Sequence, residues 1–155
     1  MAVAGDADIA RWGEPSMSPD SATVASLRRY MDAFNRGDYD ALIDFYCEDV
    51  VLVNAGGTKL ESRAAIIEFY KKVTSKTHRT IKILQAFASG DRLAAELESE
   101  FLALEDYPEF ASGPMRKGDR LYVNTFVIYE LRDGRYARIR SAPFSREWRR
   151  AGESA

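Results

Sequence analysis

The chain has 155 residues, about the length of one domain, and a hydrophobic fraction of 46%, which is ordinary for a protein with a buried core. With 22 basic and 24 acidic side chains its net charge is −2, so no strong field favours nucleic acid or an anionic membrane as a partner. The single cysteine, Cys47, excludes an internal disulfide and a metal site built from several cysteines.

No segment has the pattern of a membrane span or of a signal peptide. No apolar run approaches the roughly 20 residues that a membrane helix needs. The N-terminus carries Asp6 and Asp8 in place of a basic start, so we expect a cytoplasmic protein. Residues 1–17 are predicted to form an N-terminal arm. The arm would be either free or docked through Trp12, in the second case on another subunit.

A long helix is predicted to follow this arm. Ser18 can cap it, Pro19 suits the first helical position, and Gly37 can end it with a left-handed backbone conformation. One apolar stripe at helical spacing consists of Leu27, Tyr30, Met31 and Phe34.

Two shorter helices are predicted on either side of a strand. Asp38 can cap the first of them, and Cys47 would pack in its helical context beside an inner face of Leu42, Phe45 and Tyr46. A strand over Val50–Val53 and a glycine turn come next. Ser62 can then cap a third helix, whose apolar stripe is Ile66, Phe69, Tyr70 and Val73.

From Thr80 onward the apolar pattern has period two, which is typical of strands. Turn signals, among them Asp133-Gly134, separate four predicted antiparallel strands, one from Thr80 and the others over Leu93–Leu104, Leu121–Leu131 and Arg135–Ser141. Helices followed by a meander predict an α+β, cone-shaped fold in which the N-terminal helices pack on a curved sheet. We expect this domain to cover 18–145, with a basic tail over 146–155. The chain is expected to fray from Ser145, unless Phe144 and Trp148 hold the start of the tail.

The order of elements and three segments of text resemble the nuclear-transport-factor-2-like superfamily, and within it the SnoaL-like and ketosteroid-isomerase-like branch. The segments are RRYMDAFNRGDYDALIDFYCEDVVL, ESRAAIIEFYKK and VNTFVIYELRDGRYARIR. The resemblance implies a cone-shaped fold and a homodimer formed through the sheet face. It does not fix a function, because the superfamily contains isomerases, cyclases, dehydratases, epoxide hydrolases and non-catalytic binding domains.

The resemblance also implies site residues. Ketosteroid isomerases have a tyrosine donor on the first helix, where this chain has Tyr30, and a supporting tyrosine on the third helix, where it has Tyr70. Their aspartate base matches Asn54, and their second, aspartic donor matches Phe126. An amide cannot shuttle a proton at neutral pH and a phenyl ring cannot donate one, so the isomerase mechanism is not expected intact.

Two other mechanisms of the superfamily also lack their acids here. The aspartate of SnoaL-type cyclases matches Ser141. The arginine–aspartate set of the epoxide hydrolases has Arg138 and Arg140 as its only counterparts, with no strand acid placed to complete it.

Strand alternation predicts which side chains face the cone. The inward set is Ala95, Leu97, Ser99, Phe101, Tyr122, Asn124, Phe126, Ile128, Ile139 and Ser141. Tyr30, Asn54 and Asn124 are the candidate catalytic residues. The candidate binding residues are Phe34, Tyr46, Tyr70, Leu97, Phe101, Tyr122, Phe126 and Ile139. Together they predict an apolar, aromatic pocket for a small hydrophobic molecule of steroid, terpenoid or aromatic polyketide size.

Each polar candidate also has a structural interpretation. Tyr30 and Tyr70 can be core tyrosines with satisfied hydroxyls, and Asn54 can hold the glycine turn that follows it. Tyr122 and Asn124 face outward if the register is shifted by one residue, in which case Glu98 becomes the candidate base. His78, the only histidine, is expected in a solvated loop. The outward glutamates at 96, 98 and 100 are solvated or pair with Arg138 and Arg140 at a dimer surface.

Three functions are consistent with this pattern, and none calls for a metal, a cofactor, nucleic acid or a membrane. The first is an isomerase, dehydratase or cyclase that uses tyrosine hydrogen bonding. The second is a non-catalytic small-molecule-binding domain, and the third is a dimeric scaffold whose cone is filled. An acid beside Tyr30 in an open cone favours the first, and an open cone of neutral groups favours the second.

Overall fold

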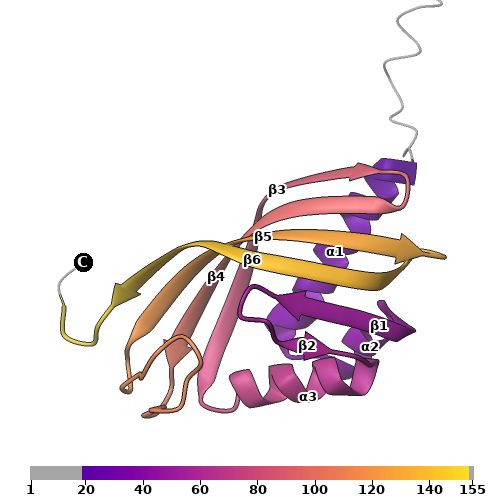
Figure 1. Ribbon diagram of the computed structural model, residues 1–155. Coiled ribbons are helices and arrows are strands. Elements are labelled where there is room, and N and C mark those ends of the chain that lie inside the picture. The colour runs from indigo at the N-terminus through magenta and orange to yellow at the C-terminus, as the bar shows by residue number, and fades with distance from the viewer. Residues whose placement is uncertain (1–18, 154–155) are drawn as a thin grey trace, which may run out of the picture.

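The computed structural model describes residues 19–153, in which three helices pack on one six-stranded sheet (Figure 1). The elements are α1 (Pro19–Arg36), α2 (Tyr39–Ile43), β1 (Tyr46–Asn54), β2 (Lys59–Leu60), α3 (Arg63–Val73), β3 (Thr77–Ser89), β4 (Arg92–Ala103), β5 (Arg120–Arg132) and β6 (Arg135–Arg149). The predicted α+β class is confirmed. The predicted N-terminal arm and the Ser18 cap lie outside the described residues.

The helix boundaries follow the capping signals of the sequence. Gly37 ends α1 with φ of +67°, a conformation that side chains with a Cβ rarely adopt. The Asp38 carboxylate accepts the N–H of Ala41 at 3.0 Å, and the Ser62 hydroxyl accepts that of Ala65 at 3.0 Å. These two predicted caps at the starts of α2 and α3 are therefore confirmed.

The region around Tyr46 differs from the prediction. Tyr46 and Cys47 belong to β1 and not to the short helix, which ends at Ile43. The reason is long-range pairing, because Tyr46 lies opposite Tyr136 of β6 and the N–H of Tyr136 donates to the carbonyl of Phe45 at 2.8 Å. The helical apolar spacing of this short segment is outweighed by its pairing in the sheet.

The sheet has the strand order β2-β1-β6-β5-β4-β3. The predicted meander of β3 to β6 is antiparallel throughout, whereas β1 pairs with β6 in parallel. Strand β6 is longer than predicted and reaches Arg149, where it pairs with Arg120 of β5. The expectation that the chain frays from Ser145 is therefore wrong, and of the two residues that could hold the tail, Trp148 packs on the core whereas Phe144 is exposed.

Two strands show how far alternation predicts orientation. On β4 the inward side chains are buried, as expected, and they include Leu97, Ser99 and Phe101. On β5 the predicted orientation is wrong by one residue. Val123, Val127 and Tyr129 are buried, while Phe126 and Ile128 are 45% and 44% exposed on the outer face. The pairing of Thr125 with the inward residue Leu97 fixes this register.

Helix α1 is attached to the sheet by its last turn. The Asn35 amide donates to the carbonyl of Ile81 at 2.9 Å and accepts the N–H of Ile81 at 2.7 Å. With α1 held on β3 and α3 lying along the opposite edge of the sheet, the two helices border the concave face (Figure 1). The space between the helices and this face, lined by the side chains described below, is called the cone.

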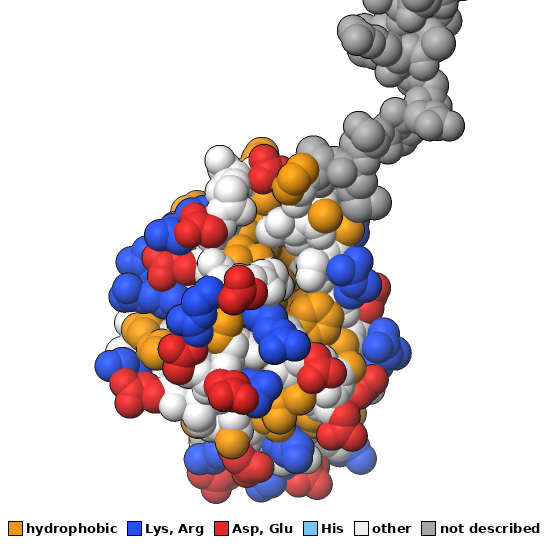
Figure 2. Space-filling view, turned by 90° about the vertical axis from the view of Figure 1, so that its right-hand side faces the viewer, with side chains coloured by type: hydrophobic (Ala, Val, Ile, Leu, Met, Phe, Trp, Pro, Cys, Tyr) orange, Lys and Arg blue, Asp and Glu red, His pale blue; other side chains and the backbone are white. Residues whose placement is uncertain are grey.

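The surface in Figure 2 mixes acidic and basic side chains with small apolar areas, in keeping with the net charge of −2. In the described part of the chain, no helix combines the length and apolar character needed to cross a membrane.

Candidate functional site

Two adjoining cavities, which share six lining residues, lie between the helices and the concave face of the sheet. The inner part, beside Tyr30, has a volume of about 60 Å³, and the wider mouth has a volume of about 410 Å³. Both parts are lined by Leu52, Tyr70, Arg79, Ser99, Thr125 and Ser141. The cone is therefore open toward one end and is not filled by side chains.

Tyrosine side chains pack around the closed end of the cone. Tyr30 lines the inner cavity and its hydroxyl forms a short hydrogen bond with that of Tyr46. The rings of Tyr129 and Tyr136 complete the cluster, with their centroids 4.7 Å apart. Burial, reinforced by the neighbouring tyrosines, raises the pKa of Tyr30 well above its usual range. At neutral pH its hydroxyl is therefore protonated and can donate a hydrogen bond.

Arg79 is a charged residue of this site that was not predicted from the sequence. It lies on β3, and its guanidinium donates from Nε and Nη2 to the Ser99 hydroxyl at 3.3 and 3.0 Å. Aromatic rings surround it, with the Phe34 and Phe101 centroids 5.4 and 4.9 Å from Cζ. These distances are within the range of cation–π contacts, which is about 6 Å.

The electrostatic environment of Arg79 is unusual for an arginine. Burial lowers the pKa of Arg79, because the surrounding side chains remove water from the charged guanidinium. Among the described residues it forms no ion pair with a carboxylate. The described lining of the cone includes Arg79 and Arg146 but no aspartate, glutamate or histidine. The cavity is therefore positively charged in a chain whose net charge is −2.

A comparison with protein families identifies the chain. The profile of the SnoaL-like domain matches residues 27–139. The chain belongs to the SnoaL-like domain family. No curated protein sequence matches it significantly.

Solved structures share the fold of this SnoaL-like protein. A candidate polyketide cyclase from Xanthomonas campestris pv. campestris is 24% identical, with a TM-score of 0.71 over 81% of this chain and 92% of that one. An LEH-like epoxide hydrolase from M. tuberculosis is 15% identical, with a TM-score of 0.65 over 81% and 85%. A candidate ketosteroid isomerase from Kribbella flavida is 17% identical, with a TM-score of 0.61 over 90% and 87%. At these identities the likeness concerns the fold alone.

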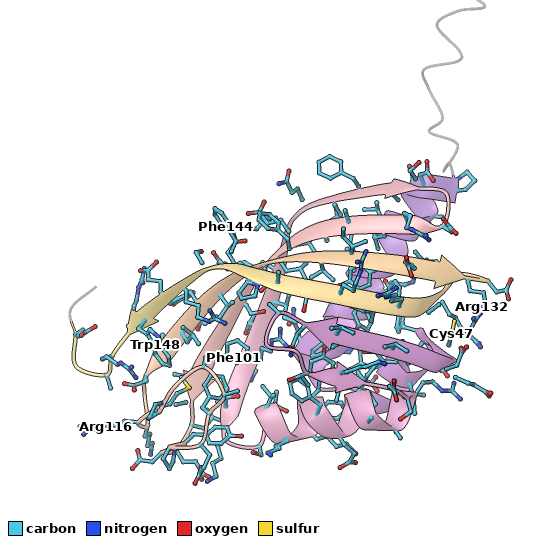
Figure 3. The ribbon with its side chains drawn as sticks, viewed as in Figure 1. Cys47, Phe101, Arg116, Arg132, Phe144 and Trp148 are labelled. Carbon is cyan, nitrogen blue, oxygen red and sulfur yellow. The ribbon has the colours of Figure 1, made fainter. Side chains whose placement is uncertain are left out.

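Within the SnoaL-like domain, several predicted binding residues face the cavity. Phe34, Leu97 and Ile139 line its inner part, Phe101 lines its mouth, and Tyr70 lines both. Figure 3 shows Phe101 on the side of the sheet that faces α3. Tyr46 is fully buried behind Tyr30 and is not among the lining residues, so it can act on the cavity only through the Tyr30 hydroxyl.

Three predicted site residues lie on the opposite face because of the β5 register. The guanidinium of Arg149 lies over the Tyr122 ring, with its Cζ atom 5.0 Å from the ring centroid. The ring of Phe126 contacts that of Phe144. Asn124 donates to the Glu96 carboxylate at 2.8 Å. The side chains that replace them in the cone are Thr125, Val127 and Tyr129. The inversion does not bring Glu98 inward, since β4 keeps its predicted orientation.

Asn54 lines the mouth of the cavity, but its side-chain oxygen is engaged in the following turn. It accepts the N–H groups of Gly56 and Thr58 at 3.2 and 3.3 Å. Asn54 therefore holds the glycine turn that follows it, which is the structural alternative given for this residue. His78 is exposed, as expected, but it lies in β3 and not in a loop.

Proposed function

We propose that the cone of this SnoaL-like protein binds a small, largely apolar molecule. The observation that supports this proposal is the open mouth of about 410 Å³, which continues into an aromatic inner cavity. Small-molecule sites typically have volumes of about 300–1,000 Å³ and combine apolar walls with a few polar groups. An open cavity of this size argues against a scaffold whose cone is filled by its own side chains.

Binding without turnover is the first candidate. Proton transfer in an isomerisation, dehydration or cyclisation needs a base within hydrogen-bond reach of the substrate. None of the described lining residues is an aspartate, a glutamate or a histidine. Steroid, terpenoid and aromatic polyketide skeletons are the size class that we propose as ligands.

A cofactor-independent isomerase, dehydratase or cyclase is the second candidate. It is supported by the Tyr30 hydroxyl, which remains a hydrogen-bond donor at neutral pH, and by the positive charge of Arg79 in the same cavity. Both groups can stabilise developing negative charge on a substrate oxygen. In such an enzyme the proton acceptor would be water or a group of the substrate itself.

Filling the cone tests ligand binding directly. We expect wild-type protein to bind the uncharged fluorescent dye N-phenyl-1-naphthylamine saturably, and Thr125→Phe to weaken binding by about tenfold or more. Thr125 lines both parts of the cavity, so a phenyl ring there removes the space that the dye needs. The measurement is a fluorescence titration, with native mass spectrometry of the purified protein to detect a co-purified ligand.

Ile128→Phe is the matched control for this experiment, because Ile128 lies on the outer face of the same strand and is 44% exposed. Its dye affinity should equal that of the wild type. Absence of saturable binding, or equal loss of binding in both variants, would contradict a ligand site in the cone.

We also propose that two copies associate through the outer face of the sheet. This face carries exposed apolar side chains at Phe87, Phe126, Ile128 and Phe144, with exposures between 44% and 71%. Phe144 lies on the side of the sheet away from α3 (Figure 3). Glu98 of β4 and Arg140 of β6 border the same face, so a second copy could supply opposite charges to both.

A charge placed in this apolar face should dissociate the dimer. We expect the wild type to sediment as a dimer and Phe144→Glu as a monomer in analytical ultracentrifugation, because the glutamate would lose its water at the interface. Leu104→Glu, at a 52% exposed residue just beyond β4, should leave the dimer intact. A monomeric wild type would refute the association.

A further inference from the structure

The charge of Arg79 is not explained by the packing around it. Its neighbours are aromatic rings and the hydroxyls of Ser99 and Tyr70, and Ser99 is only 2% exposed. An uncharged side chain of similar length could fill the same space without the free-energy cost of removing water from a cation. The cation–π contacts recover part of this cost, about 0.5–2 kcal/mol each.

The guanidinium also retains hydrogen-bonding capacity toward the cavity. Ser99 accepts from Nε and Nη2, and the Tyr70 side chain is a further hydrogen-bond partner. These bonds use only part of the planar set of five N–H donors. Arg79 lines both the inner cavity and the mouth, so its free donors lie where a ligand would enter. A planar fork of N–H groups matches the two oxygens of a carboxylate.

The rest of the lining would also favour an anion. The only other charged residue in the described lining is Arg146, at the mouth. Thr125 and Ser141 line both parts of the cavity, and their hydroxyls form no hydrogen bond with another described side chain. An anionic ligand would therefore meet a cation and two free hydroxyl donors but no competing carboxylate.

We propose that the cone selects molecules that carry a carboxylate or an equivalent oxyanion on an apolar body, and that Arg79 holds this group. This inference rests on the proposed ligand site and specifies the chemical class of its ligand. The aromatic rings around Arg79 would pack on the apolar body, while the guanidinium pairs with the anion in a partly desolvated site. In that environment the ion pair is stronger than one at the surface.

A pair of probes of equal shape tests this selectivity. Naphthalene-2-carboxylate and its uncharged analogue naphthalene-2-carboxamide are titrated at neutral pH against protein loaded with N-phenyl-1-naphthylamine. We expect wild-type protein to bind the carboxylate about tenfold more tightly than the carboxamide. Arg79→Met should abolish this preference, and Arg79→Lys should keep part of it.

Two arginine variants serve as matched controls. Arg140→Met removes a charge from the outer face and should leave the preference unchanged. Arg146→Met removes the exposed charge at the mouth and should reduce the preference less than Arg79→Met does. Arg79→Met should still bind the neutral dye, which shows that the cone is folded, and should melt no lower than the wild type because a desolvated charge is removed.

The outcomes separate this inference from the proposed function. Equal affinity of wild-type protein for the two naphthalenes, or a preference that survives Arg79→Met, overturns the anion selectivity while the neutral dye still reports a ligand site. A preference lost in Arg146→Met but kept in Arg79→Met also overturns it. If the neutral dye does not bind in the cone, the ligand site itself is refuted.

Discussion

Replacing Leu121 with alanine is expected to lower the free energy of unfolding by about 3 kcal/mol, within the range of about 2–5 kcal/mol for buried leucines. Leu121 is fully buried on the inward face of β5, where it pairs with Phe101 and Trp148 on the neighbouring strands. Alanine at this position removes apolar contacts and leaves a cavity that the rigid sheet cannot close. The change is measured by urea denaturation followed by circular dichroism.

Ile128→Ala provides a closely matched comparison, because leucine and isoleucine are isomers and both changes remove the same atoms. Ile128 is 44% exposed on the outer face of the same strand. We expect a loss below about 1 kcal/mol, and any effect transmitted through the proposed dimer should depend on protein concentration. A larger loss from Ile128→Ala than from Leu121→Ala would show that the β5 register is the one predicted from the sequence.

Replacing Asp119 with alanine should cost about 2–4 kcal/mol of stability, since hydrogen bonds to a charged group contribute about 1.5–3 kcal/mol each and are not additive. The Asp119 side chain is buried and accepts the backbone N–H groups of Arg116 and Ala151 at 2.9 and 2.8 Å. The carboxylate also accepts a hydrogen bond from Nη1 of Arg150 at 2.9 Å. These bonds attach the chain after β6 to the loop before β5.

The contribution of Asp119 should depend on pH. Burial by itself would raise the pKa of Asp119, but the hydrogen bonds from Arg116, Ala151 and Arg150 hold it below the ordinary value of 3.8. Because the pKa is lower in the folded state, the stabilisation is complete above the unfolded value and is lost as pH falls through the folded value. The difference between wild type and Asp119→Ala should therefore shrink as the pH falls below about 4.

Asp106→Ala is the control for this change. Asp106 is exposed in the same loop and accepts one backbone N–H, that of Lys117, at 2.9 Å. We expect its replacement to cost less than about 1 kcal/mol. Equal losses in the two variants would contradict a special role for the buried carboxylate.

The helices and the fold class could be read from local signals in the sequence. Capping residues and glycines act within one helical turn, so Asp38, Ser62 and Gly37 mark their boundaries whatever the rest of the chain does. The same holds for the hairpin turn at Asp133-Gly134, where both residues have positive φ. These elements and their order were enough to predict an α+β cone.

The composition of the site was only partly predictable. The inward face of β4 could be assigned because its other face carries glutamates. Strand β5 carries large apolar groups on both faces, since Phe126 and Ile128 extend the apolar outer surface. Hydrophobic alternation then cannot distinguish the two registers. Tyr122 and Asn124, two of the polar residues expected in the cone, were assigned to the wrong face for this reason.

Arg79 was missed because β3 begins at Thr77, three residues before the predicted start of the strand. Extending the alternation of Ile81 and Ile83 back by two residues places Arg79 on the inward face, but the strand was predicted to begin only at Thr80. By itself, the sequence determined the caps, the helical stripes and the period-two strands, because these depend on neighbours in the chain. The tertiary structure alone decided the β5 register, the strand state of Tyr46 and the partial burial of Arg79 without a carboxylate partner, because each depends on partners from distant strands.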